Sequence, residues 1–230
     1  DIESLPYIEA VRQMKWESPE NTLVIHLTLV PYLSAAGELK TKPTQHSVKQ
    51  LLQLGIQPDV LVCRTEHHLT PAIRSKLAQF CNVNLESVIE SIDASTIYDV
   101  PLLMQEERLD EVVLKKLGLY STDVAKPDLK NWKEFLYRYK NPDSTVHIGL
   151  IGKYVELKDA YKSISEALAH AGAHLKNKVE IHWIHSEKVT STSSAELLGK
   201  LDGILVAPGF GSRGIDGKLE AIKFARTNNI

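Results

Sequence analysis

The stretch Asp59-Val60-Leu61-Val62-Cys63 is apolar at every position after its first. A continuous apolar run of this length is typical of a strand that is buried on both faces, and such strands occur in parallel sheets. Helical patterns flank it over 44–54, where Thr44 is the predicted N-cap, and over 71–80. A buried strand between two helices favours an α/β fold with a mostly parallel sheet.

The same alternation of strands and helices extends along the chain with one interruption. Strands are predicted over 22–30 and 87–92, and a single helix over 102–117. The pattern weakens from Ser121 to Ser144, where two prolines bracket a short helix. We therefore predict two doubly wound domains with mostly parallel sheets, joined by a linker. The expected ranges are 1–119 for the first domain, 120–145 for the linker and 146–230 for the second domain.

The second domain shows three strand–helix pairs. The predicted strands cover 146–151, 179–184 and 203–206. The predicted helices cover 159–170, 195–201 and 217–226, and the first of them is expected to end at Gly172. Lys153 lies in the turn after the first strand and is expected to be solvated.

Composition excludes several classes of protein. A formal net charge of −2 over 230 residues gives no general attraction to nucleic acid. The longest apolar runs are too short to span a membrane. Two cysteines cannot form a disulfide framework, so a reducing cytoplasm is the simplest location. We expect Cys63 to be buried and Cys81 to be partly exposed. The chain begins without methionine and is expected to be part of a longer protein.

The segment Lys40-Thr41-Lys42-Pro43-Thr44-Gln45 carries the strongest chemical signal. Two lysines and two threonines precede a helix N-terminus, and this combination suits a polyphosphate. Between residues 40 and 76 the chain has six basic and two acidic residues. The alternative interpretation is a solvated loop before a capped helix.

The segment Gly209-Phe210-Gly211-Ser212-Arg213-Gly214 matches the G-x-G-x-x-G pattern of dinucleotide-binding proteins. It is not the first strand–helix turn of its domain, and the acidic partner would lie at or beyond Ile230. A loop whose backbone N–H groups approach a small substrate or an oxyanion is therefore the favoured interpretation.

Asp1 and Glu3 place two carboxylates at a helix start, where they would stabilise the helix dipole or bind metal or ribose hydroxyls. The histidines and cysteines form no metal-binding motif.

Five segments together resemble the CTP synthase family in order and spacing. They are Asp1-Ile2-Glu3-Ser4-Leu5-Pro6, the Lys40–Gln45 segment, Ile97-Tyr98-Asp99-Val100-Pro101, Gly152-Lys153-Tyr154 and the Gly209–Gly214 segment. The resemblance implies an enzyme that converts UTP to CTP. ATP phosphorylates the uracil O4, and ammonia from L-glutamine displaces the phosphate. It also implies Mg²⁺ as cofactor, GTP as activator, CTP as inhibitor and a cytoplasmic homotetramer.

The resemblance also assigns sites. The UTP and CTP site is expected at Lys40, Thr41, Lys42, Pro43, Thr44, Gln45 and Lys76. Further CTP contacts are expected at Asp1, Ile2 and Glu3, and the adenine side of the ATP site at Ile92, Asp93 and Ala94. In the second domain, the glutamine and oxyanion loop is expected at Gly209 and Phe210. The lid that couples GTP to glutaminase chemistry is expected at Arg213, Gly214 and Asp216.

Two positions depart from the family pattern, and both catalytic centres are expected to be incomplete. Pro208 stands where the family often has glycine, so one backbone donor is missing. Asp216 stands where glutamate is common. The resemblance places the phosphate-binding loop and most magnesium ligands before Asp1, and the amidotransferase triad after Ile230. The alternatives are a non-catalytic nucleotide-sensing module of the same fold and an NAD-dependent dehydrogenase.

Overall fold

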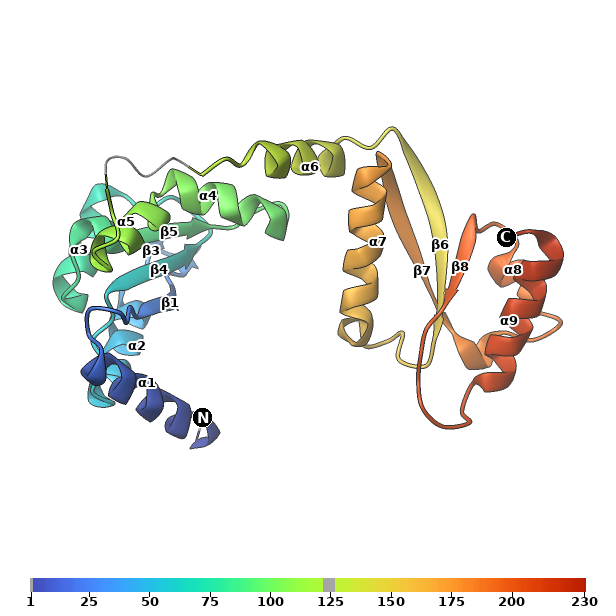
Figure 1. The fold of residues 1–230 in the computed structure, drawn as a ribbon, viewed down its shortest axis with the longest axis horizontal. Helices are drawn as coiled ribbons and strands as arrows, with labels where there is room; N and C mark the ends of the chain where they lie inside the picture. Colours follow the sequence, from blue (N-terminus) through green and yellow to red (C-terminus); the bar gives the residue numbers. More distant parts are fainter. Residues whose placement is uncertain (1, 122–126) are drawn as a thin grey trace. The chain divides into compact units, whose positions relative to one another are not determined.

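The computed structural model describes residues 2–121 and 127–230. The chain divides into two compact units, Asp1–Lys126 and Pro127–Ile230, and Figure 1 shows the helices and strands of each. Each unit is built on its own sheet of three parallel strands. The predicted α/β class with parallel sheets is therefore confirmed.

The first unit is centred on the strand that the apolar run predicts. Its sheet has the order β1-β4-β5, with β1 at Ile25–Leu29, β4 at Val60–Thr65 and β5 at Val88–Ile92. Val60 and Val62 point to one face of β4, and Leu61 and Cys63 to the other. All four side chains are buried, which explains why the run is continuously apolar.

Helices cover both faces of this sheet. The helices α2 (Lys42–Gln53) and α3 (Pro71–Cys81) pack on the face of Leu61 and Cys63. The helices α4 (Val100–Glu106) and α5 (Leu109–Lys116) cover the opposite face, where Val112 meets Val60 and Val62. The remaining elements are η1 (Ile2–Ser4), α1 (Leu5–Glu17), β2 (Tyr32–Leu33), β3 (Glu38–Leu39), η2 (Leu85–Ser87) and η3 (Ile97–Asp99).

Two predictions for this unit were wrong in detail. The helix expected over 102–117 is broken at Arg108, which adopts a left-handed conformation with φ of 60°. Glu107, just before the break, binds Arg74 and the backbone of Glu90, so tertiary contacts override the local helix propensity. The N-cap position of α2 is Thr41, because the helix begins at Lys42, two residues before the predicted start.

One strand of the sheet is left largely open. Ile25, Leu27 and Leu29 alternate along β1 and are 44%, 67% and 53% exposed. They pair in register with Val60, Val62 and Arg64, so they extend the α4–α5 face of the sheet beyond the helices that cover it. We call these three residues the open face of β1. The helix α1 likewise has no buried residue.

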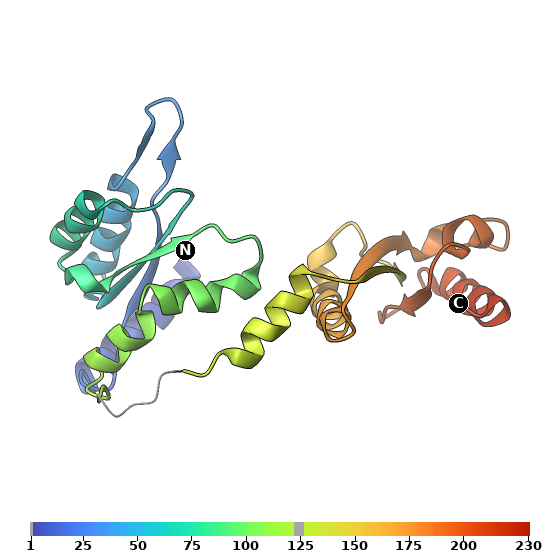
Figure 2. The same cartoon turned by 90° about the horizontal axis from the view of Figure 1, so that it is seen from above.

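The second unit repeats the doubly wound arrangement. Its sheet has the order β7-β6-β8, with β6 at Ser144–Gly152, β7 at Asn177–His185 and β8 at Gly203–Val206. Its helices are α6 (Lys130–Lys140), α7 (Lys162–His174), α8 (Ser194–Leu198) and α9 (Ile215–Asn228), with η4 (Lys158–Tyr161) and η5 (Ser186–Lys188). Leu150 packs in a core with Tyr161, and Ile151 in a second core with Leu198 and Ala221. Neighbouring residues of β6 thus serve opposite faces of the sheet, and Figure 2 gives a second view of these layers.

The end of one helix in this unit differs from expectation. The helix expected to end at Gly172 continues as α7 to His174, and Gly172 is buried where the helix meets β7. A Cβ at Gly172 would lie 2.6 Å from the carbonyl oxygen of Asn177, so glycine permits this close packing. The helix α6, expected within the linker, packs on α7, with Phe135 edge-on to His170. No helix in the described residues has the length and apolar character needed to cross a bilayer.

Candidate functional site

The expected nucleotide-binding segments of the first unit lie at one edge of its sheet. The segment Lys40–Gln45 follows β1 through the β2–β3 hairpin, and Ile92–Ala94 begins with the last residue of β5. The N–H of Asp93 donates to the carbonyl of Thr65 at 3.0 Å, which joins the ends of β4 and β5. Because all three strands are parallel, these segments share the carboxyl edge, where open α/β sheets bind ligands.

A cavity of about 500 Å³ brings three lysines together at the start of α2. Lys40 and Lys42 come from the segment before and within the first turn of α2, and Lys76 comes from α3. Lys40 is paired with Glu38, and the hydrogen bond from Lys40 lowers the pKa of the Glu38 carboxyl. The full lining is Glu38, Leu39, Lys40, Thr41, Lys42, Ile73 and Lys76. Four of the seven expected UTP and CTP residues therefore meet in one cavity.

The two threonine hydroxyls of this segment are used inside the fold. Thr44 is fully buried; its hydroxyl donates to the carbonyl of Leu29 at 2.9 Å and accepts from Thr28 at 3.1 Å. The hydroxyl of Thr41 accepts from the side-chain amide of Gln45 at 3.1 Å. The two bonds of Thr44 fix the start of α2 against β1. The donors left for a ligand are the lysine side chains, the O–H of Thr41, which only accepts in the bond from Gln45, and the N–H groups of the first helical turn.

The other expected residues of the first unit are more dispersed. Pro43 is exposed in the first turn of α2, where its missing N–H costs no helical bond. Ile2 and Glu3 are exposed in η1 and do not line the cavity, and Asp1 lies outside the described residues. Asp93 is exposed and bonds Arg64 at 3.2 Å. Ile92 is half-buried and Ala94 is exposed.

The glycine-rich segment of the second unit is an exposed loop between β8 and α9. Gly211 and Gly214 have φ of 77° and 72°, a conformation that favours glycine. A Cβ at Gly214 would lie 2.2 Å from the hydroxyl of Ser186, and one at Gly217 only 1.7 Å from its carbonyl oxygen. Turn geometry and close packing on η5 thus explain why residues 211, 214 and 217 are glycines. No bound dinucleotide is needed to account for them.

The expectation that Lys153 is solvated was wrong. The residue is only 3% exposed, and its ammonium donates to the carbonyls of Phe210 at 2.6 Å and Gly211 at 3.0 Å. Lys218, on α9, donates to the carbonyl of Ala207 at 2.7 Å. The sequence places Lys153 after a strand, but no local pattern shows that a long side chain turns inward beneath a loop 57 residues away in sequence.

The expected lid residues lie at the end of this loop. The guanidinium of Arg213 lies 5.7 Å from the ring centre of Tyr154, within range of a cation–π contact. Gly214 occupies the N-cap position of α9, and Asp216 lies in the first turn, where a carboxylate stabilises the helix dipole. Gly209 and Phe210 are both exposed to solvent.

Neither the cysteines nor the histidines form a catalytic or metal centre in the described residues. Both cysteines are completely buried, so the expected partial exposure of Cys81 was wrong. Burial raises the pKa of the Cys63 thiol to about 12, and it also raises the pKa of Cys81. Residues 2–121 and 127–230 contain no group of three or more His, Cys, Asp or Glu side chains that could hold a metal ion.

Comparison with protein-family models identifies both halves of the chain. Residues 1–119 match the model described as CTP synthase N-terminus. Residues 156–230 match the model described as glutamine amidotransferase class-I. The second match covers the glycine-rich loop.

Individual relatives agree with the family models. The CTP synthase of Cytophaga hutchinsonii is 65% identical over 231 residues, which cover the whole chain and 42% of that relative. The CTP synthase of Flavobacterium johnsoniae is 64% identical over the whole chain, which covers 43% of that relative. The CTP synthase of Porphyromonas gingivalis is 56% identical over the whole chain, which covers 42% of that relative. The chain thus spans about two fifths of the curated relatives it matches, and it belongs to the CTP synthase family.

Proposed function

We propose that the chain is a section of a longer CTP synthase. It would supply the pyrimidine-nucleotide part of the synthetase domain, residues 1–119, and the beginning of the amidotransferase domain, residues 146–230, with 120–145 between them. The whole protein would convert UTP to CTP, using ATP and ammonia from L-glutamine. The family matches and the identity to CTP synthases support this proposal. The open face of β1 also supports it, because a soluble domain rarely leaves a sheet face uncovered.

The observation that carries the proposal is the cavity at the start of α2. Three lysines converge on it, and the helix directs its free N–H groups to the same place. Such a site is suited to a triphosphate, whose several negative charges need several cationic partners. Lys42 and Lys76 would bind the phosphates of UTP or CTP, while Thr41 and Thr44 would hold the loop in position.

The remaining assignments follow the family. Main-chain groups of Ile92, Asp93 and Ala94 would bind the adenine of ATP, and Asp1, Ile2 and Glu3 would contact CTP. Gly209 and Phe210 would face glutamine, with Arg213, Gly214 and Asp216 as the GTP-linked lid. By the same family resemblance, Mg²⁺ would serve as cofactor, with most of its ligands outside this chain. A cytoplasmic homotetramer is part of the same proposal, and this section alone would have no catalytic activity.

The experiment that tests the proposal is calorimetric binding of UTP and CTP to the full-length protein that contains this chain. The Lys42→Ala variant is expected to lose about tenfold or more in affinity for both nucleotides and to keep its affinity for ATP, because it loses one charged phosphate contact. Lys49→Ala is the matched control, since Lys49 is an exposed lysine of the same helix that does not line the cavity.

Two other outcomes would contradict the proposal. Equal nucleotide affinities in the two variants and the parent would show that the triphosphate binds elsewhere. Normal UTP binding by a full-length protein that forms no CTP from UTP, ATP and ammonia would favour the nucleotide-sensing module instead.

A further inference from the structure

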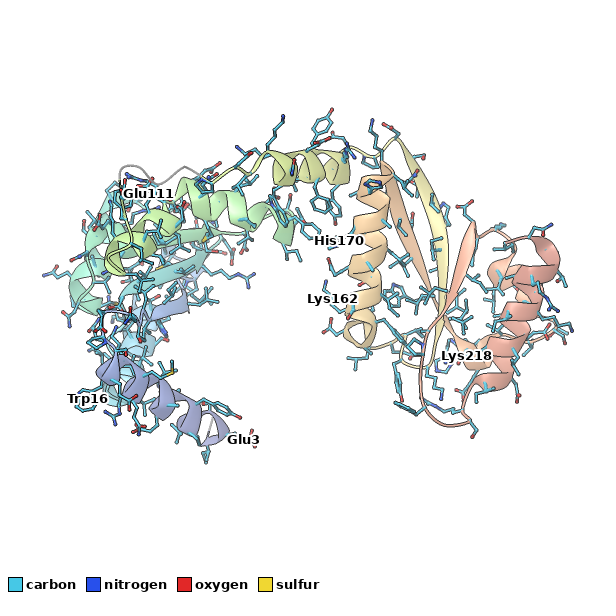
Figure 3. All side chains as sticks on the ribbon, viewed as in Figure 1. Glu3, Trp16, Glu111, Lys162, His170 and Lys218 are labelled. Atoms are coloured by element: carbon cyan, nitrogen blue, oxygen red, sulfur yellow. The ribbon has the colours of Figure 1, made fainter. Side chains whose placement is uncertain are left out.

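Two ammonium groups lie directly beneath the glycine-rich loop of the second unit. Lys153 comes from the end of β6, and Lys218 from the second turn of α9, where Figure 3 labels it. Together they bind three carbonyl oxygens of one five-residue segment, those of Ala207, Phe210 and Gly211. The Ala207–Gly211 segment is therefore held near both of its ends by lysine side chains.

The orientation of these carbonyls determines the orientation of the loop's N–H groups. In a planar trans peptide the carbonyl and the following N–H point in opposite directions. Because the carbonyls of Phe210 and Gly211 point to Lys153, the N–H groups of Gly211 and Ser212 point away from it. The lysine thus fixes two consecutive peptides of an exposed loop that includes a glycine with positive φ, where other conformations are readily reached.

The position of Lys153 is itself fixed. Its backbone N–H donates to the hydroxyl of Tyr161 at 3.0 Å, and Tyr161 is buried. A Cβ at Gly152 would lie 2.5 Å from the same hydroxyl oxygen, so glycine at this position lets Tyr161 approach. A rigid support of this kind is what a loop needs if it is to present groups to a reacting centre.

No carboxylate neutralises the pair among the described residues. Neither Lys153 nor Lys218 takes part in an ion pair there, and Gly209 lies between them, with its Cβ position within 3.8 Å of both side chains. Burial, and next the charge of Lys153, lower the pKa of Lys218. An uncompensated positive field beneath a loop favours negative charge on the loop's outer side, as in oxyanion stabilisation. Pro208 adds to the need for support, because it contributes no N–H of its own.

We infer that Lys153, assisted by Lys218, is a positioning residue for glutamine hydrolysis that holds the Ala207–Gly211 segment in its active conformation. This inference rests on the proposed amidotransferase function of the loop. It predicts that the lysines affect the step that releases ammonia and leave the synthetase reaction intact.

The test uses the full-length protein and compares CTP formation from glutamine with CTP formation from added ammonia. Lys153→Met, which keeps the length but removes the charge and the donors, is expected to lower kcat for glutamine-dependent CTP formation roughly 10- to 100-fold. The KM for glutamine and the ammonia-dependent rate are expected to stay within about twofold, since binding and the synthetase site are unchanged. Lys200→Met, at an exposed lysine of the same unit, is the control.

Lys218 provides a second measurement that does not depend on the tolerance of the buried site. Lys218→Met is expected to lower the glutamine-dependent kcat, and Lys218→Arg to restore most of it, because the guanidinium keeps the charge and a donor. A purely structural role would instead raise the KM for glutamine and lower the melting temperature in proportion to the loss of activity.

Two outcomes separate a failure of the inference from a failure of the proposed function. If the parent forms CTP from glutamine and Lys153→Met does so at the same kcat, the inference is wrong and the proposed function stands. If the parent itself forms CTP from neither glutamine nor ammonia, the proposed function fails, and the inference fails with it.

Discussion

Thr44 belongs to the most specific segment of the sequence, yet its side chain acts inside the fold. Its hydroxyl bridges the carbonyl of Leu29 and the hydroxyl of Thr28, so α2 is fixed against β1. The sequence predicts an anion-binding segment here, because lysines and threonines precede a helix. It cannot show which hydroxyls are already satisfied by the fold, since that depends on a strand 15 residues away.

Cysteine reactivity is a prediction that belongs to the single residue. Cys63 and Cys81 are fully buried, and burial raises the pKa of Cys63 to about 12. At pH 8 only about one Cys63 in ten thousand would be ionised, and the thiolate is the reactive form. We expect neither residue to be alkylated by iodoacetamide at pH 8 in the native full-length protein, and both to be alkylated in urea. Peptide mapping by mass spectrometry measures this. Labelling of native Cys63 at the rate seen in urea would contradict it.

The break between α4 and α5 shows how side-chain contacts set the limits of an element. Arg74, on α3, donates to both carboxylate oxygens of Glu107 at 2.7 and 2.9 Å. The N–H of Glu90, on β5, donates to the same carboxylate at 2.8 Å. This network joins the two helical layers across the edge of the sheet. A continuous helix through residues 107 and 108 would lose these hydrogen bonds.

The network makes a pH-dependent contribution to stability. Burial alone would raise the pKa of Glu107, but the hydrogen bonds from Arg74 and Glu90 outweigh it, so the pKa is lowered. The stabilisation is therefore complete above the unfolded-state pKa of about 4.3 and is lost as the pH falls through the lower folded-state pKa.

The Glu107→Gln variant tests this contribution. At pH 7 it is expected to lower the free energy of unfolding by about 1.5–3 kcal/mol, the contribution of hydrogen bonds to a charged group. As the pH falls below about 4.3 the difference from the parent is expected to shrink, because the unfolded parent takes up a proton at Glu107 before the folded parent does. Urea unfolding across this pH range measures it, with the exposed neighbour Glu106→Gln as control. A difference that stays constant with pH would show that the charge of Glu107 is not involved.

At the scale of the whole molecule, the sequence predicts the fold class and most elements. The apolar run Val60–Cys63 predicts a buried strand directly, and the mostly apolar segment Val146–Ile151 predicts a second strand; they correspond to β4 and β6. The strands β2 and β3 have two residues each, too few to show a period. Lys153 and Cys81 were misjudged because their environment comes from segments distant in sequence.

The cavity residues were predictable for a different reason. Lys40, Thr41 and Lys42 form a contiguous, specific segment, and Lys76 was added by the family resemblance. Only the structure shows that α3 brings Lys76 to the same cavity. The open face of β1 could not be predicted, because an apolar pattern does not show which segment, if any, covers a strand.

The open face predicts opposite effects of one substitution in two forms of the protein. In the isolated 230-residue chain, Leu27→Arg is expected to raise the soluble fraction, because it removes exposed apolar surface. In the full-length protein it is expected to lower the melting temperature by several degrees, because we propose that another segment covers Leu27. Leu175→Arg is the matched control: Leu175 is also 67% exposed, but it lies at the C-cap of α7 and not in a strand. A stable full-length Leu27→Arg variant would mean that the face stays uncovered.

The open face of β1 also has a consequence for the life of the protein in a cell. Chaperones and proteases act on apolar surface that a finished fold would hide. Any form of the protein in which Ile25, Leu27 and Leu29 stay uncovered, such as a product of early termination or internal cleavage, would present that signal continuously. Quality control would then remove the damaged copies, and they would not accumulate beside the intact protein.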